Sequence, residues 1–507
     1  MKEYREHTVR IAKNTMMLYI RMLFMMFLGL FTSRIVLEAL GENDYGVYNV
    51  VGGVVAMFSI ISGALSTAVS RFITYEMGKG QDAQQGKVYS ASVTVMLLLS
   101  LIVIILAEPA GLWFIENKMT ISPERVTAAK WVLQFSLLAF VINLMSVPQM
   151  ATITAHEKMS AYAYIGILDG ILRFSVALLL MHSSSDRLVL YALLMSVTVM
   201  IIRAAYGIYC HRHFDECRYR PSKDYRLFKE IFSFAGWSFI GTASGVLRDQ
   251  GGNILVNIFA GPAMNAARAV AVQLNSAIQS FVTNFMTAVN PQITKSYASG
   301  EHEYMFSLMR KASRMSYYLL FIIALPVIFN AEYVLSLWLK DVPGSSASFV
   351  RLFLVFTLSE SISLPLITSM QATGRIRNYQ LVVGGLQLMN LPVSYLFLRA
   401  GFQPEVTVAV AIGISQICLV ARLFMLRGMI GLSISEFLRR VYLNVLSVTA
   451  AAVVFPLLFS MYFADSPATF VCSVILCLIS ACVAIYLVGC SRDEKKVLYS
   501  FIKNRIS

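Results

Sequence analysis

Long apolar stretches recur along the whole chain and are separated by short polar links. A stretch of about 20 apolar residues can cross a hydrocarbon core of about 30 Å as an α-helix. The two-residue alternation of a membrane β-barrel is absent from the sequence. The pattern predicts about 14 membrane-spanning helices, near residues 14–37, 47–71, 90–115, 127–149, 160–182, 187–209, 232–259, 264–289, 315–339, 347–371, 379–399, 405–426, 438–462 and 467–489.

The composition agrees with this pattern and excludes an ordinary soluble domain. Of the 507 residues, 57% are hydrophobic and only 14% are charged, and the mean hydropathy is +0.66. The core of a soluble protein cannot cover so much apolar surface. We therefore expect an all-α polytopic membrane protein.

Basic residues gather on one side of the membrane when the N-terminus is placed in the cytoplasm. That side receives both termini, the loop 210–229 and the links near 295–314, 375–377 and 427–440. The opposite links carry only a few basic residues, so the positive-inside rule places both termini in the cytoplasm. Because topology accounts for much of the net charge of +14, we expect no nucleic-acid partner.

The longest basic loop, 210–229, separates two sets of six spans that enter the membrane in the same direction. Leu40-Gly41 after the first span also resembles Ala260-Gly261 after the seventh span. Parallel repeats of this kind are a known plan for transporters, with the site between the halves. We expect these divisions: an N-lobe at 1–211, a basic linker at 212–229, a C-lobe at 230–430, and extra spans thirteen and fourteen with a tail at 431–507.

The sequence contains no motif for nucleotide hydrolysis. It has neither a Gly-rich phosphate loop nor a soluble stretch long enough for an ATPase domain, so we expect no enzyme. Energy would come from an ion gradient, the membrane potential or the cargo. Four potential metal ligands at 210–217 match no common zinc spacing, so we expect no metal and no cofactor.

Charged residues lie within the predicted spans. Arg248 and Asp249 lie near the middle of the seventh span, and Arg268 lies just inside the eighth. A charged side chain in the bilayer core costs about 3 kcal/mol or more, so such residues usually face a wet cavity and bind or move something. These positions predict a substrate path.

Polar residues continue from these charges along two helix faces. In the seventh span Asp249, Asn253 and Asn257 recur every four residues. In the eighth, Arg268, Asn275 and Gln279 lie within about 40° of one another at 100° per residue. The two faces are expected either to meet across a hydrated cavity or to join helices through hydrogen bonds, as amides commonly do in membranes.

The N-terminal half carries its own charged positions. Arg21 lies inside the first span without a local partner, and Arg71 ends the second. Arg34 and Glu38, and Asp169 and Arg173, are spaced i,i+4 and can pair internally. Arg34 and Arg173 are therefore candidates either for the cavity or for internal ion pairs, and Arg71 is a further candidate for the cavity.

Arginine suits an anionic cargo, because its planar fork binds phosphate oxygens bidentately and stays charged when dehydrated. Arg21, Arg248 and Arg268 are the strongest candidates for contacts with such a cargo. Asp249, Glu360 and Asp169 are candidates for coupling to H⁺ or Na⁺, although each carboxylate can instead be held by an arginine.

Short motifs give the chain a family resemblance. The stretch 37–48, LEALGENDYGVY, resembles the turn between the first two spans of bacterial polysaccharide flippases of the multidrug/oligosaccharidyl-lipid/polysaccharide exporter superfamily. Residues 261–268, 288–293 and 373–375 resemble the matching parts of the second half. The likeness covers most of the chain up to about residue 430.

The resemblance implies two six-helix lobes around a central cavity that opens alternately to each side, with two extra C-terminal helices. It implies a cargo of oligosaccharide repeat units on undecaprenyl diphosphate, flipped across the bacterial inner membrane for O-antigen or capsule assembly. Arg21 and Arg268 match cavity positions by their place in the first and eighth spans. Membrane lipid, a polysaccharide polymerase and chain-length proteins are the implied partners.

Two alternatives remain open from the sequence. One is a multidrug/cation antiporter of the same fold, although the deep acidic residue that drug exporters often keep in the first span is missing here. The other is a non-transporting membrane scaffold in a polysaccharide assembly complex. A scaffold would tolerate changes at Arg21, Arg248 and Arg268.

Overall fold

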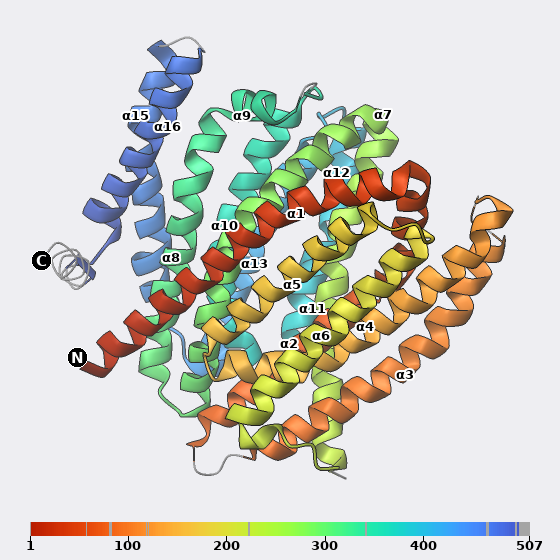
Figure 1. The fold of residues 1–507 in the computed structure, drawn as a ribbon. Coiled ribbons are helices and arrows are strands. Elements are labelled where there is room, and N and C mark those ends of the chain that lie inside the picture. Colours follow the sequence, from red (N-terminus) through yellow and green to blue (C-terminus); the bar gives the residue numbers. More distant parts are fainter. Residues whose placement is uncertain are drawn as a thin grey trace, which may run out of the picture. The chain divides into compact units, whose positions relative to one another are not determined.

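The computed structural model describes residues 2–56, 58–80, 84–117, 119, 121–221, 224–339, 342–462, 466–491 and 494–495. Within these ranges the chain forms helices and short links and no strands (Figure 1). The main helices are α1 (Lys2–Ala56), α2 (Ser59–Gly78), α3 (Gln85–Asn117), α4 (Val126–Ala155), α5 (Met159–Met181), α6 (Arg187–His213), α7 (Tyr225–Ala298), α8 (His302–Phe329), α9 (Ala331–Trp338), α10 (Ser346–Ala372), α11 (Arg377–Leu388), α12 (Asn390–Arg399), α13 (Val406–Ile430), α14 (Ile434–Phe437), α15 (Leu443–Tyr462) and α16 (Pro467–Ala484).

Twelve helical segments of the described residues are long and apolar enough to cross a membrane. Since α7 contains two of the predicted spans, these twelve segments account for thirteen of the about 14 predicted ones. The predicted span at 47–71 is not among them, because it is divided between the end of α1 and α2. The prediction of an all-α multi-pass membrane protein is confirmed.

The predicted ninth span, 315–339, has the wrong bounds. Helix α8 begins at His302 and ends at Phe329, and a separate short helix, α9, follows. The break occurs at Asn330, whose Nδ2 donates to the carbonyl of Pro326 at 2.8 Å. The backbone N–H of Asn330 donates to the same carbonyl at 3.1 Å, and the backbone angles of Asn330, φ −118 and ψ 34, are not helical.

Two glycines bend α1 and α7 in the same way. Gly41 has φ 72 and ψ 169, and Gly261 has φ 78 and ψ −177, so α1 and α7 each consist of two helices joined at a non-helical glycine. This left-handed region is accessible to glycine without steric cost. The similarity between Leu40-Gly41 and Ala260-Gly261 thus corresponds to the same backbone conformation at both places.

The chain divides into two compact units. Unit 1 comprises residues 1–242 and 294–300, and unit 2 comprises residues 243–293 and 301–507. Helix α7 therefore contributes its two ends to unit 1 and its middle to unit 2. The lobe boundaries drawn from the sequence remain a prediction.

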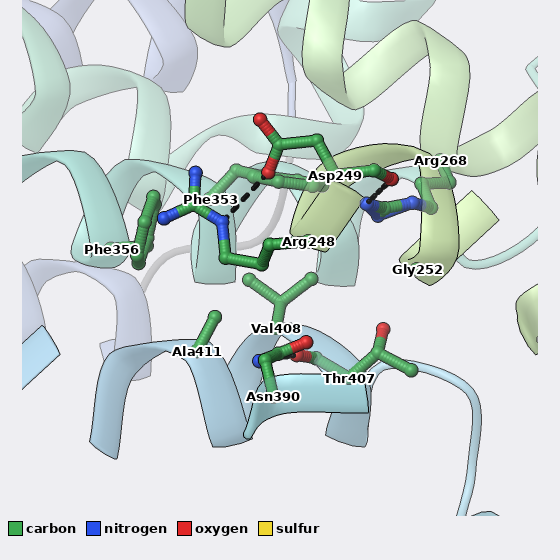
Figure 2. A pocket seen from close by; sticks show the side chains of 10 residues that line it. All are labelled: Arg248, Asp249, Gly252, Arg268, Phe353, Phe356, Asn390, Thr407, Val408 and Ala411. Atoms are coloured by element: carbon green, nitrogen blue, oxygen red, sulfur yellow. Dashed lines mark hydrogen bonds and ion pairs between the residues drawn. The ribbon is translucent and has the colours of Figure 1, made fainter. Parts of the chain in front are cut away.

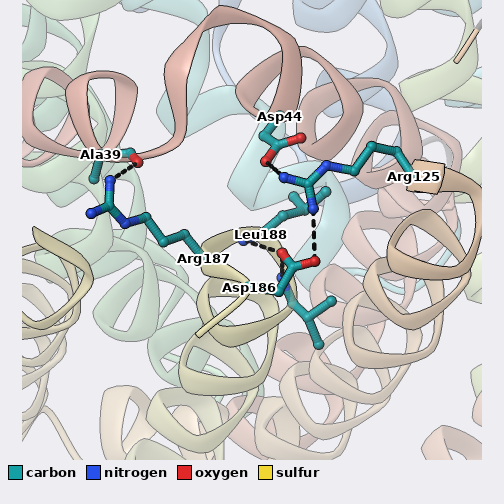
Figure 3. Close-up of polar contacts among 7 residues, drawn as sticks. Ala39, Asp44, Arg125, Asp186, Arg187 and Leu188 are labelled. Atoms are coloured by element: carbon teal, nitrogen blue, oxygen red, sulfur yellow. Dashed lines mark hydrogen bonds and ion pairs between the residues drawn. The ribbon is translucent and has the colours of Figure 1, made fainter. Parts of the chain in front are cut away.

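In unit 1, helix α4 packs against α6, α3 and α2, and α1 packs against α5. Polar contacts fix the link after the bend of α1 (Figure 3). Arg125 donates to the carboxylates of Asp44 at 2.6 Å and Asp186 at 2.7 Å, and Arg187 donates to the carbonyl of Ala39 at 3.0 Å. Burial raises the pKa of Asp44, and the charge of Arg125 opposes that rise. These contacts join the α1 link to the beginnings of α4 and α6.

In unit 2, helix α10 packs against α8 and α13, and α11 and α12 pack against α13. The two C-terminal helices α15 and α16 lie side by side and contact α8 (Figure 1). Arg314 of α8 donates to Glu494 at 2.7 Å and to the carbonyl of Gly489 at 2.9 Å. The C-terminal helices are thus attached to α8 by a largely buried ion pair.

Candidate functional site

A small cavity in unit 2 brings together three of the charged residues found in the sequence (Figure 2). Its walls come from α7, α10, α12 and α13. The lining residues are Arg248, Asp249, Gly252, Arg268, Phe353, Phe356, Asn390, Thr407, Val408 and Ala411.

The bend of α7 at Gly261 makes this cavity possible. Arg268 and Asn253 are 15 residues apart, yet Arg268 Nε donates to Asn253 Oδ1 at 2.8 Å. In a straight helix those residues would be separated by roughly 22 Å along the axis. The left-handed glycine therefore folds the second part of α7 back beside the first.

Arg268 is held on several sides. Only 5% of the residue is exposed, its Nη2 donates to the carbonyl of Asp249 at 3.2 Å, and its guanidinium lies 5.1 Å from the ring centre of Phe353. A Cβ on Gly252 would lie 2.9 Å from Nη2, so the missing side chain of Gly252 provides the room. Nη1 is buried without a hydrogen-bond partner. A buried donor of this kind favours an incoming acceptor, because an unmade bond costs about 1–3 kcal/mol.

Arg248 supplies the second cation. Its Nε donates to Asp249 Oδ1 at 2.9 Å, and its guanidinium lies 5.0 Å from the ring centre of Phe356. The Asp249 side chain is 59% exposed, so its carboxylate only partly neutralises the two arginines. With two cations and one anion, the lining carries a formal charge of +1. The electrostatics of the lining therefore favour an anion over a cation.

The polar faces of the seventh and eighth predicted spans meet only in part. Asn253 belongs to the Arg268 cluster and also donates to Gln250 at 3.2 Å. Asn275 is buried and accepts from Thr357 of α10 at 2.8 Å, which is a helix-joining contact. Asn257 and Gln279 are exposed and lie outside the lining of the cavity.

The remaining arginine candidates belong to unit 1. Arg21 stacks on Tyr162 of α5 at 4.4 Å, and its Nε is buried without a hydrogen-bond partner. Arg71 lies against the rings of Phe72, Tyr75 and Phe234. Both guanidiniums are thus held by aromatic faces, which stabilise a cation in a poorly hydrated place.

Of the two possible i,i+4 ion pairs of unit 1, one forms and the other does not. Arg173 donates to Asp169 at 2.9 Å, so this predicted i,i+4 pair forms, and the coupling candidate Asp169 is engaged by an arginine. Arg34 and Glu38 are both exposed and form no ion pair with each other, so of the two alternatives for Arg34 the internal pair does not form. Exposure explains the difference, because ion pairing between solvated side chains has little net benefit.

Replacing Gly166 by alanine is expected to displace Arg21. A Cβ at this position would overlap Arg21 Nε, Cδ and Cζ, so the guanidinium would have to leave the face of Tyr162. If Arg21 contacts the cargo, the rate of transport should fall several-fold, as expected for loss of a cation–π contact of about 1 kcal/mol. Gly170→Ala is the matched control, because its Cβ would meet the flexible end of Met25 instead. Equal export by both variants would exclude Arg21 from the transport path.

Two buried polar residues of unit 2 could not be singled out from the sequence. Arg422 is 1% exposed and lies 3.8 Å from Glu360 Oε1, so this coupling candidate also faces an arginine. Arg422 lies near the end of its predicted span, where a basic residue looks like a topology signal. Asn390 is 2% exposed and donates to the carbonyl of Thr407 at 3.3 Å, and no sequence pattern distinguished it.

Comparisons with solved structures agree with the helical membrane fold. One solved structure, a MATE protein in the bent conformation, matches with a TM-score of 0.73 and 13% identity, over 83% of this chain and 96% of that one. Another, a MOP superfamily transporter from Pyrococcus furiosus, matches with a TM-score of 0.69 and 14% identity, over 84% and 96%. The chain is thus a multi-pass membrane protein with the fold of MOP superfamily transporters.

The sequence comparisons identify the family to which the chain belongs. The model of the polysaccharide biosynthesis protein family matches residues 11–297, more than half of the chain, and the chain belongs to that family. It is also 20% identical over 296 residues to the uncharacterized membrane protein EpsK of Bacillus subtilis. That match covers 58% of this chain and 58% of the length of EpsK.

Proposed function

We propose that the protein is a flippase that moves undecaprenyl-diphosphate-linked oligosaccharide repeat units from the cytoplasmic to the periplasmic leaflet. The observation that carries the proposal is the buried guanidinium of Arg268, with Nη1 unpartnered, beside Arg248 in a cavity of net positive charge. A diphosphate presents acceptor oxygens that match such forks. Membership of the polysaccharide biosynthesis protein family supports this cargo class.

In the proposed cycle the arginines attract the diphosphate from the cytoplasm, polar side chains accept the sugars, and the prenyl chain stays in lipid. The transporter then opens toward the other side. The cargo can drive that change only if it binds the two states with different affinity. A membrane potential that is negative inside favours outward movement of negative charge by about 2.3 kcal/mol per charge per 100 mV.

Coupling and location are further parts of the proposal. The three carboxylate candidates, Asp249, Glu360 and Asp169, each lie near an arginine. H⁺ or Na⁺ would act by competing with that arginine and so resetting the cycle. The protein would lie in the inner membrane with both termini in the cytoplasm, in contact with membrane lipid and with a polymerase and chain-length proteins that build O-antigen or capsule.

Deletion of the gene in its own host tests this function. We expect loss of surface polysaccharide, accumulation of lipid-linked repeat units inside the membrane, and full rescue by the wild-type gene. Arg248→Ala plus Arg268→Ala should not rescue at equal membrane levels. The matched control is Arg375→Ala plus Arg399→Ala, which removes the same charge from exposed positions outside the cavity and should rescue.

The outcomes separate the proposal from its two alternatives. Rescue by both double variants would favour a membrane scaffold, since a scaffold does not need a cationic cavity. Unchanged surface polysaccharide after deletion, together with greater sensitivity to cationic drugs, would favour a multidrug antiporter. Loss of polysaccharide without accumulation of the lipid-linked unit would place the defect before the flipping step and would also contradict the proposal.

A further inference from the structure

A second pocket of unit 2 lies between α9 and the facing ends of α15 and α16, and we call it the α9 groove. It shares no lining residue with the Arg248–Arg268 cavity. Its lining consists of Phe329, Asn330, Glu332, Tyr333, Phe459, Ser460, Ser466, Thr469, Phe470 and Ser473. We propose that the α9 groove binds uncharged sugar rings of an oligosaccharide.

Aromatic rings form one part of this lining. Tyr333 of α9 and Phe470 of α16 stack with ring centres 4.2 Å apart and an interplanar angle of 28°. Phe329 and Phe459 add two more rings to the groove. A pyranose ring has a face of C–H groups that packs on an aromatic face, so aromatic side chains with a few placed polar groups suit a sugar.

Hydroxyl and amide groups form the other part. Asn330 uses one N–H for the carbonyl of Pro326 at 2.8 Å and keeps its carbonyl oxygen and a second N–H for a ligand. Ser460 donates to the carbonyl of Leu457 at 2.9 Å, so its oxygen can still accept. Small neutral groups that both donate and accept match the alternating needs of sugar hydroxyls.

The charges near the groove favour a neutral ligand over a phosphate. Glu332, the charged lining residue, is paired with Arg351 at 2.6 Å. Arg351 also donates to the carbonyl of Ile328 at 3.0 Å, which occupies it further. An anionic head group would therefore meet a carboxylate and no unneutralised cation among the lining residues. A carboxylate does accept well from sugar hydroxyls.

Local structure keeps the groove in shape. Ala331 and Leu335 anchor α9 through fully buried side chains. Ser466 and Thr469 form a reciprocal capping box at the beginning of α16, which fixes that helix end. The groove is therefore bounded by two helix ends whose positions are set independently of any ligand.

The place of the groove gives it a role that rests on the proposed function. Under the predicted topology, α9 and the facing ends of α15 and α16 lie on the periplasmic side, opposite the basic loops. A flipped repeat unit delivers its sugars to that side. The α9 groove would hold the sugars of the delivered unit while its diphosphate leaves the arginines.

Binding of lipid-free sugar tests the groove separately from transport. The probe is the neutral oligosaccharide fraction released by mild acid from the host's own surface polysaccharide, titrated calorimetrically into the full-length protein in nanodiscs. We expect saturable binding to the wild type and at least tenfold weaker binding to Tyr333→Ala plus Phe470→Ala. Arg375→Ala plus Arg399→Ala should bind like the wild type, because those exposed residues lie outside both cavities.

A second variant tests whether weaker binding reflects the groove and not misfolding of the double alanine variant. Ser473→Phe keeps the stacked rings and fills the groove from a buried position of α16, so it should also abolish binding. Absence of saturable binding to the wild type, or equal affinity in the wild type and in both folded groove variants, would overturn the proposal. The probe lacks lipid and diphosphate. Absence of sugar binding together with successful genetic rescue would therefore contradict the groove proposal and leave the flippase proposal intact. Sugar binding without genetic rescue by the wild-type gene would contradict the flippase proposal and leave the groove proposal intact.

Discussion

Replacing Arg268 by alanine will reduce surface polysaccharide export about 10- to 150-fold at an unchanged membrane level of protein. A hydrogen bond to a charged group contributes about 1.5–3 kcal/mol, and each 1.4 kcal/mol corresponds to a factor of ten. The side chain bonds to Asn253 and Asp249, and its buried Nη1 remains for the cargo. Radiolabelled sugar incorporated into surface polysaccharide per minute is the measurement.

Arg268→Lys is the informative companion variant. It keeps the positive charge and loses the planar fork that reaches Asn253 and the Asp249 carbonyl together. We expect a defect between those of wild type and alanine. Gly252→Ala, whose Cβ would press on Nη2, should reproduce part of the defect without touching the charge. Normal export by Arg268→Ala would show that this arginine is structural.

Replacing Arg422 by alanine will have the largest effect on stability, a loss of about 3–5 kcal/mol. Arg422 is 1% exposed and lies 3.8 Å from Glu360, whose side chain is 20% exposed. Removing one partner of a buried ion pair leaves an uncompensated charge, which is the costly case. The measurement is the midpoint of thermal aggregation of the purified protein in detergent, with chemical denaturation as a second readout.

The double variant Arg422→Met plus Glu360→Gln separates structure from coupling. Replacing both partners removes the unpaired charge, so most of the stability should return. If Glu360 also couples transport to H⁺, this stable variant will export without dependence on the gradient. Equal destabilisation by the single and the double variants would mean that Arg422 and Glu360 do not interact energetically.

Several parts of the fold followed from local sequence alone. Apolar length located thirteen of the predicted spans, because a helix must cross a fixed thickness of hydrocarbon. Gly41 and Gly261 could be matched because their left-handed conformation strongly favours glycine. The end of α8 at Phe329 could not be placed, since apolar residues resume in α9 and the non-helical backbone of Asn330 is visible only in the structure.

Part of the candidate site could also be predicted from the sequence. Arg248, Asp249 and Arg268 could be recognised because charge inside an apolar span is unusual. Their aromatic and amide neighbours, such as Phe353 and Asn390, come from α10 and α12 and appear only through tertiary packing. A phenylalanine or asparagine within a span has too many ordinary roles for sequence to single it out.

Reconstituted flipping tests the central claim most directly. Purified protein in proteoliposomes would receive undecaprenyl-diphosphate oligosaccharide from the host, and a membrane-impermeant glycosidase would report how much reaches the accessible leaflet. The account predicts rapid movement with the wild type, at least tenfold slower movement with Arg248→Ala plus Arg268→Ala, and normal movement with Arg375→Ala plus Arg399→Ala. Movement by the wild type no faster than in protein-free liposomes would contradict it.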